Sequence, residues 1–170
     1  PLSATTYYFK DINDLITDTF ALFVERSAEA MSAFWAGADQ LLQELQTGLQ
    51  RGPDVRLQVL EQLVEVAIAY VQAQLTQHRE RLLAEQAFRL EALLNPGLLE
   101  LAAAHRKILV QGVDKFFQVL GSPQPEADAK VLTGMILQME YQGLLDGVDH
   151  LNLDEMRSIL RRYLRLVMGL

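Results

Sequence analysis

Apolar residues recur at steps of three and four along almost the whole chain, which is the spacing of an α-helix with one buried face. The first stripe begins near Asn13 and continues toward Gly48, passing Gly37, where we expect the helix to bend or end. Arg-Gly-Pro-Asp at 51–54 separates this stripe from the next. Glycine is expected to end the first helix there, and Asp54 to cap the second.

Five further helices are predicted after the first long one. The second carries its leucines on one face and Glu65 on the opposite face, so Glu65 is expected in solvent. The third ends at Asn95, because the following proline disfavours a helical conformation in the residue before it. The stripe expected to face the core in this third helix is Leu82, Leu83, Gln86, Leu90 and Leu93. The remaining helices are expected over 98–120, 127–149 and 154–168. Nothing in the chain predicts a strand, so we predict an all-α fold.

The last two predicted helices carry apolar residues on more than one face, so each needs two sets of packing partners. One set is the body of the chain, and the other is a second copy of the chain or further elements of the same monomer. Gly143 and Gly147 are four residues apart, so we expect them to share a face that another helix approaches closely. We favour a homodimer with an isologous four-helix interface. The residues expected in it are Leu132, Met135, Met139, Gly143, Gly147, Met156, Leu160, Tyr163 and Leu164.

An aromatic cluster precedes the first long helix. A short Ser/Thr segment runs into Tyr7, Tyr8 and Phe9, and Leu15 follows six residues after Phe9. This segment resembles the end of the helix-turn-helix of TetR-family transcriptional repressors. In that family an aromatic cluster closes the recognition helix, and a Phe and a Leu at this spacing lead into the connecting helix.

The resemblance implies that residues 1–10 are the remnant of a DNA-binding head and that 11–170 form an effector-binding and dimerisation domain. The family commonly has Tyr and Lys three residues before and after the Phe, where this chain has Thr6 and Ile12. The DNA-proximal residues of the remnant are therefore expected to be Thr5, Thr6, Tyr7, Tyr8 and Lys10. The two helices that precede this motif in the family are expected before Pro1 in the full protein.

Two later landmarks resemble the same family. Asn95-Pro96 stands in mid-chain, where an Asn-Pro break commonly separates two regulatory helices. A glycine-bearing helix, a turn at 150–152 and a terminal helix rich in Leu and Arg then resemble the family's dimerisation end. The resemblance implies a dimer that binds operator DNA and that releases or binds it in response to a small effector.

The length and composition of the chain are those expected of one intracellular domain. The chain has 170 residues, half of them apolar, which is long enough for a proper core. Cysteine is absent, so disulfides and thiolate chemistry are excluded. No apolar run is long enough for a membrane span, and we expect a cytoplasmic protein. The formal net charge is −7, which lacks the basic surplus that phosphate binding needs, so operator DNA is expected to be bound through the missing N-terminal domain.

The motifs of the common enzyme and metal sites are missing. The chain has no glycine-rich phosphate loop, and His78, His105 and His150 form no Glu-x-x-His or His-Glu-x-x-His pair. Paired carboxylates such as Asp154 and Glu155 stand at helix starts, where capping explains them better than acid–base catalysis. We therefore expect no enzyme activity, no cofactor and no metal.

An effector pocket would lie among the helices, and polar residues on apolar stripes are the candidates for its polar contacts. His105 is such a residue, and the alternative for it is a core histidine bonded to a carbonyl. Ser27 is another, with bonding to its own helix as the alternative. The aromatic candidates are alternatively plain core. The full set of candidate pocket residues is Phe23, Ser27, Phe34, Trp35, Tyr70, Gln86, His105 and Phe116.

The resulting interpretation is a ligand-responsive, TetR-like transcriptional regulator. Because the stripes carry few charges, the effector is expected to be small and largely apolar or aromatic. Two other classes stay open. A helical protein–protein interaction module with no ligand and no DNA role would have a filled core and an exposed groove. A small helical enzyme would have clustered polar groups with perturbed ionisation in a cleft.

Overall fold

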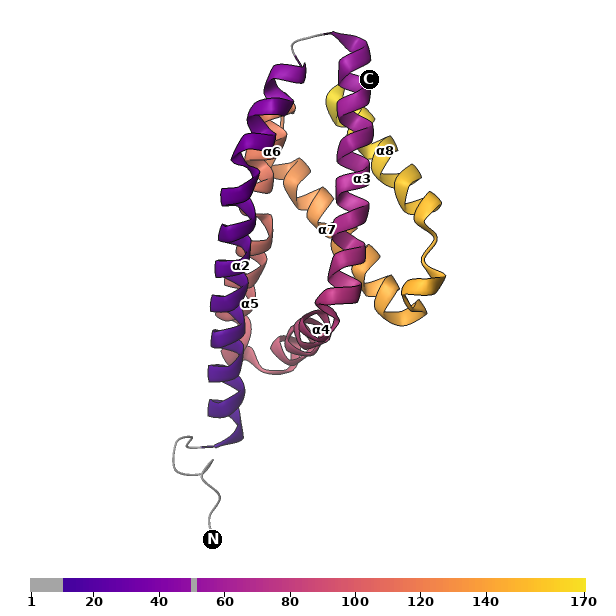
Figure 1. The fold of residues 1–170 in the computed structure, drawn as a ribbon. Coiled ribbons are helices and arrows are strands. Elements are labelled where there is room, and N and C mark those ends of the chain that lie inside the picture. The colour runs from indigo at the N-terminus through magenta and orange to yellow at the C-terminus, as the bar shows by residue number, and fades with distance from the viewer. Residues whose placement is uncertain (1–10, 50–51) are drawn as a thin grey trace.

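The chain folds into helices throughout its described length. The computed structural model describes residues 11–49 and 52–170, and these contain seven α-helices, two short 3₁₀ helices and no strand (Figure 1). In chain order they are α2 (Ile12–Leu49), α3 (Pro53–Gln77), α4 (Arg79–Leu94), η1 (Pro96–Leu98), α5 (Leu99–Val110), α6 (Val113–Val119), α7 (Pro125–Asp146), η2 (Val148–His150) and α8 (Leu153–Met168). The predicted all-α fold class is confirmed. None of the described helices combines the length and apolar character that spanning a membrane requires.

The first long helix begins where its polar residues predict. The Asp11 carboxylate accepts a hydrogen bond from the Asp14 backbone N–H at 2.9 Å, and α2 then continues without a break through Gly37. The next helix begins differently from the prediction. Gly52, with φ of 120°, precedes Pro53 at the first helical position, and Asp54 lies inside the first turn without capping it. Proline suits this position because the N–H it lacks has no partner there.

The helix predicted over 98–120 is two helices, α5 and α6. They are separated at Gly112, whose φ of 89° lies in the left-handed region that favours glycine. The Trp35 side chain from α2 packs on this glycine so closely that an added Cβ would lie 2.5 Å from the indole nitrogen. The prediction was wrong because the apolar spacing continues across the break, whereas the close approach of Trp35 comes from a distant part of the chain.

The core is organised around α3. α2 and α3 are joined at one end of the molecule and diverge toward the other, where α4 lies between them (Figure 1). α7 crosses obliquely from α6 to α3, and α8 lies along α3. The larger apolar cluster is centred on Leu60, Val64 and Val71 of α3, which are fully buried. A smaller one joins Phe20 and Val24 of α2 to Ala92 and Leu98.

The C-terminal helix packs one face on α3 of its own chain. Its buried residues are Met156, Leu160, Leu164 and Met168. Two ion pairs flank this seam, with Arg157 2.8 Å from Glu65 and Arg161 2.7 Å from Glu61. Glu65 is exposed, as its position on the second helix predicts. Asn152 caps the helix by accepting a hydrogen bond from the Glu155 N–H at 3.1 Å.

Several residues predicted for a dimer interface lie in the core of one chain. Gly143 packs against the Leu75 side chain of α3, so it serves a close approach within the monomer. Gly147 ends α7 with φ of 87° and does not share a helical face with Gly143. The predicted residues that the single chain buries are Met139, Gly143, Met156, Leu160 and Leu164. The single chain covers most of the surface of these five residues, although Met139 and Met156 also line a concave surface between α7 and α8.

Candidate functional site

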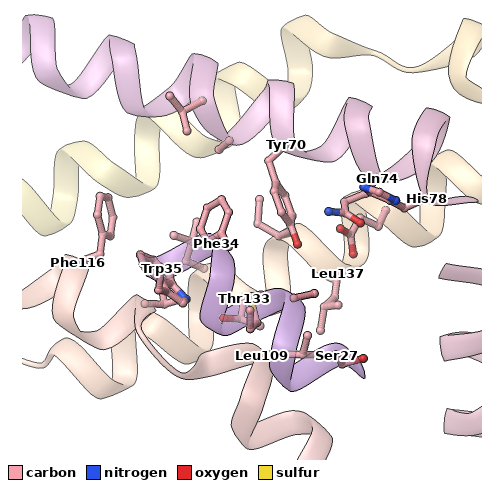
Figure 2. Close-up of a pocket in the computed structure, with 18 of the residues that line it drawn as sticks. Ser27, Phe34, Trp35, Tyr70, Gln74, His78, Leu109, Phe116, Thr133 and Leu137 are labelled. Atoms are coloured by element: carbon pink, nitrogen blue, oxygen red, sulfur yellow. The ribbon is translucent and has the colours of Figure 1, made fainter. Parts of the chain in front are cut away.

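A cavity of about 380 Å³ lies between α2, α3, α4, α5, α6 and α7. One end is aromatic. Phe34 and Trp35 from α2 contact each other edge to face at 5.1 Å between ring centroids, and Phe34 lies 6.0 Å from Tyr70. Figure 2 shows these rings with Phe116 at one end of the cavity, Tyr70 in the middle, and Gln74 and His78 at the other end. Phe34 on α2 and Val66 on α3 are both about half exposed, so the cavity opens between these two helices.

The other end of the cavity is polar and charged. Glu85 of α4 and Glu140 of α7 line it with exposed fractions of only 6% and 3%. Arg81 lines the same end, and its guanidinium donates a short hydrogen bond to the Gln74 side-chain carbonyl. The nearest salt-bridge partner of Glu85 is Arg89 at 3.9 Å, which is too long for a hydrogen bond, and the Arg89 side chain is half exposed.

The buried polar atoms that lack a partner all belong to residues that line this cavity. Among the described residues four buried side-chain atoms have no hydrogen-bond partner: Trp35 Nε1, Glu85 Oε1, His105 Nε2 and Thr133 Oγ1. All four residues line the cavity, from four different helices. Leaving a buried polar group unpaired costs about 1–3 kcal/mol. The residues that carry these unpaired atoms thus lie around a single cavity.

Burial shifts the ionisation of the polar end. Desolvation, together with the Glu85 charge, raises the pKa of Glu140 to about 8. Burial also raises the pKa of Glu85, which the Arg89 and Arg81 charges oppose. Burial, together with the Arg89 and Arg81 charges, lowers the pKa of His105 to about 4, so this imidazole is neutral at pH 7. Desolvation and the nearby carboxylates raise the pKa of Tyr70 to about 12.

The comparison with protein families decides what kind of domain holds this cavity. The family model of the Tetracyclin repressor-like C-terminal domain matches residues 58–169, which run from α3 through α8. The chain belongs to the TetR family. Among curated proteins no individual match is found. The expected TetR resemblance is thus confirmed, and the all-α bundle is the regulatory domain of a TetR-family regulator.

Most of the predicted pocket residues of this TetR-like domain meet in the cavity. Those that line it are Ser27, Phe34, Trp35, Tyr70, His105 and Phe116. Phe23 lies outside the lining, in the smaller apolar cluster, where its ring packs 5.2 Å from that of His105. Gln86 also lies outside the lining, although its neighbour Glu85 is inside. His105 lines the cavity and is buried, and its Nε2 has no hydrogen-bond partner among the described residues.

The charged end of the cavity is what the sequence prediction missed. The stripe expected on α4 is rotated in the structure, with Leu83, Leu90 and Leu93 exposed and Glu85 turned inward. Glu140 lies on α7, which is apolar on nearly all sides, so no clear polar face marks it as inward or outward. Buried charged residues are few among the described residues, as expected, but the sequence did not indicate that Glu85 and Glu140 both line the cavity. Glu85 stands three residues after Leu82 and three before Phe88, a spacing that places it on the same helical face as these two apolar residues.

A second concave surface lies outside the monomer core, between α7 and the first half of α8. It encloses about 420 Å³, and its apolar members include Val131, Met135 and Ile159. Val131 and Ile159 are exposed, and Gly134 beside them has open space around its Cα. The polar residues Gln138 and Gln142 complete the stripe on α7. We call this surface the α7–α8 groove. Its exposed side chains are accessible to a partner, whereas Leu160 and Leu164 are buried in the single chain.

The raised pKa of Glu140 predicts that the domain loses stability as pH rises from 6.5 to 8. In that window the folded protein retains a proton that an unfolded glutamate, with a pKa of 4.5, has already lost. His105 opposes the effect only at the low end of this window, where an unfolded histidine with a pKa of 6.5 is still partly protonated, and it is neutral in both states by pH 8. We expect a fall of up to about 2 kcal/mol, at 1.36 kcal/mol for each pH unit of the window.

Urea unfolding at several pH values measures this effect. Glu140→Gln should flatten the pH profile between 6.5 and 8, because the amide does not titrate. Glu100→Gln, a change of the same type at an exposed position, should keep the wild-type slope. A wild-type profile that is flat or rising over this window would contradict the assignment.

Proposed function

We propose that this domain is the ligand-sensing part of a transcriptional regulator. A molecule bound in the 380 Å³ cavity described above would control the binding of the regulator to its operator. The observation that carries the proposal is the set of four unpaired buried polar atoms gathered around one cavity. The DNA-binding head would precede the described residues, and the cell compartment would be the cytoplasm. The predicted head remnant, Thr5, Thr6, Tyr7, Tyr8 and Lys10, lies outside the described residues.

The coupling would run through α2. This helix carries Ser27, Phe34 and Trp35 of the cavity and begins at Ile12, directly after the proposed remnant. Ser27 lies fifteen residues beyond Ile12, which is about 22 Å along an α-helix. A tilt of about 5° at the cavity would therefore move the start of the helix by roughly 2 Å. Such a shift would change the spacing of two heads, which DNA half-sites constrain geometrically.

A proline in the segment between cavity and head should uncouple ligand from operator. Thr17 lies on α2 between Ile12 and Ser27, and its hydroxyl donates to the Asn13 carbonyl. Thr17→Pro removes a backbone hydrogen bond and kinks the helix, at a cost of about 3 kcal/mol. In the intact protein, ligand should still bind but should no longer release the operator. Trp35 is the only tryptophan in the chain and lines the cavity, so its fluorescence reports binding separately from DNA release.

Thr17→Ala is the matched control for this experiment. It removes the same hydroxyl and keeps the helix, so induction should stay close to wild type. Compounds that change Trp35 fluorescence provide the ligands, and a gel shift with operator DNA provides the second readout. Unchanged induction in Thr17→Pro would reject α2 as the connection. A lack of any effect of pocket ligands on operator binding by the wild type would reject the proposed function itself.

We also propose that the domain is a homodimer formed through the α7–α8 groove. The family assignment and the exposed apolar stripe support this proposal. Of the interface residues predicted from sequence, Met135 borders the groove, whereas Leu132 lines the ligand cavity. Tyr163 is half-buried and its hydroxyl bonds to Asp128 within the chain. The proposed interface is therefore Val131, Gly134, Met135, Gln138, Gln142 and Ile159.

The cavity argues differently for the two alternative functions, a protein–protein interaction module and a small helical enzyme. A protein–protein interaction module would have a filled core, which a cavity of 380 Å³ argues against. A small enzyme is favoured by one feature, the raised pKa of Glu140 beside Glu85 in a cleft. The family argues for a regulator, and no enzyme activity is proposed. Turnover of a pocket-bound compound at a rate that Glu140→Gln reduces would instead support the enzyme.

A further inference from the structure

The polar end of the cavity has more carboxyl groups than cationic groups to offer a ligand. Glu85 and Glu140 bring two carboxyl groups from different helices, and Arg81 brings one guanidinium. Arg81 bonds to the neutral Gln74 amide, and within the described residues no salt bridge joins it to either carboxyl group. Arg89 does not line the cavity and approaches Glu85 no closer than 3.9 Å. The carboxyl groups thus lack the close cation that buried carboxylates normally have.

The unpaired carboxyl groups also indicate a positively charged ligand. Glu85 lines the cavity and is more than nine-tenths buried, and its Oε1 has no hydrogen-bond donor. No hydrogen bond to Glu140 from any described residue is found either, although its side chain is equally buried. A carboxylate accepts hydrogen bonds and attracts cations, and it offers nothing to an anion. Toward the opposite end lie the rings of Phe34, Trp35 and Tyr70, whose faces attract apolar groups and cations alike (Figure 2).

We infer that the cavity binds an amphipathic aromatic cation, with its positive group between Glu85 and Glu140 and its apolar body against Phe34, Trp35 and Phe116. This inference rests on the proposed function and names the class of ligand for the same site. It adds one positive group to the expected small, largely apolar or aromatic effector, because the sequence stripes did not include the two inward carboxyl groups. The net charge of −7 also raises the local concentration of cations around the protein.

Proton release provides an independent sign of the same binding mode. Glu140 is faced by Glu85, Arg81 and Arg89 from α4 and by Tyr70 from α3, and His78 and His105 line the same cavity. With a pKa near 8, Glu140 is mostly protonated at pH 7, and a bound cation would favour its carboxylate form. Cation binding should therefore release a proton at pH 7. The affinity should rise with pH up to about 8 and then level off.

Three probes of nearly the same shape but different charge test the inference on the wild-type domain. They are naphthyltrimethylammonium, its uncharged isostere tert-butylnaphthalene, and naphthalenesulfonate, with affinities measured by equilibrium dialysis at pH 8. We expect the cation to bind at least about tenfold more tightly than the neutral isostere and the anion to bind most weakly. Glu140→Gln and Glu85→Gln should each lower cation affinity about tenfold or more. Both variants should leave the affinity for the neutral isostere unchanged, which shows that the cavity is intact.

Calorimetry in two buffers of different ionisation enthalpy provides the proton count at pH 7. Proton release by the wild type and none by Glu140→Gln would support the inference. Equal or tighter binding of the neutral isostere or the sulfonate would overturn it, while leaving the proposed ligand-controlled regulator in place. Cation binding that both glutamine variants retain would also overturn it. If none of the three probes binds, both the cation inference and the ligand role of this cavity fail.

Discussion

Ile159→Asp is expected to convert the homodimer into monomers. Ile159 lies on the α7–α8 groove and is 44% exposed in the single chain, so the substitution leaves the monomer core intact. In an isologous interface the change occurs twice. An unpaired carboxylate buried at each copy costs about 2 kcal/mol or more. The dimer dissociation constant should therefore rise roughly a thousandfold, from about 4 kcal/mol of lost binding free energy.

Sedimentation velocity over a range of concentrations measures this change. Leu83→Asp is the matched control, because Leu83 on α4 is 43% exposed and lies outside the groove. It should leave the dimer unchanged. Circular dichroism of both variants should retain the wild-type helix signal. A dimer that survives Ile159→Asp, or one that Leu83→Asp dissociates equally well, would place the interface elsewhere.

Leu160→Ala is expected to destabilise the folded monomer by about 3 kcal/mol. Leu160 is fully buried in the cluster between α8 and α3. Removing such a side chain loses its transfer free energy and leaves a cavity that the surrounding helices fill incompletely. The measurement is urea unfolding in the Ile159→Asp background, where dimer dissociation does not contribute to the unfolding free energy.

The matched control is Leu166→Ala on the same helix. Leu166 is 72% exposed, so the change should alter the unfolding free energy by less than about 0.5 kcal/mol. This pair separates a core role for Leu160 from the interface role that the sequence pattern suggested. If Leu160→Ala weakened dimerisation in an otherwise wild-type chain and left monomer stability unchanged, the packing of α8 on α3 would be wrong.

The family and fold class were predictable because their signals are local and repeated. Helical spacing recurs through the whole chain, and Asn95 with the following proline forms a break that the structure retains, with Asn95 extended and bonded to Gly97. The aromatic candidates for the pocket were predictable for a related reason. Phe34, Trp35 and Tyr70 lie on the inner stripes of the two longest helices, so any bundle built from those stripes brings them together.

The sequence by itself determined an all-α fold, because helical periodicity depends only on residues three and four positions apart. The TetR family was recognised separately, from the resemblance of a few short motifs. The tertiary structure alone decided which way the ambiguous helices face. Whether Glu85 points inward and whether Leu160 meets its own α3 or another chain depends on how helices far apart in sequence are rotated against one another. A helix that is apolar on several sides, such as α7, offers several rotations. Packing against α3 and α6 selects the one that buries Glu140 and exposes Val131.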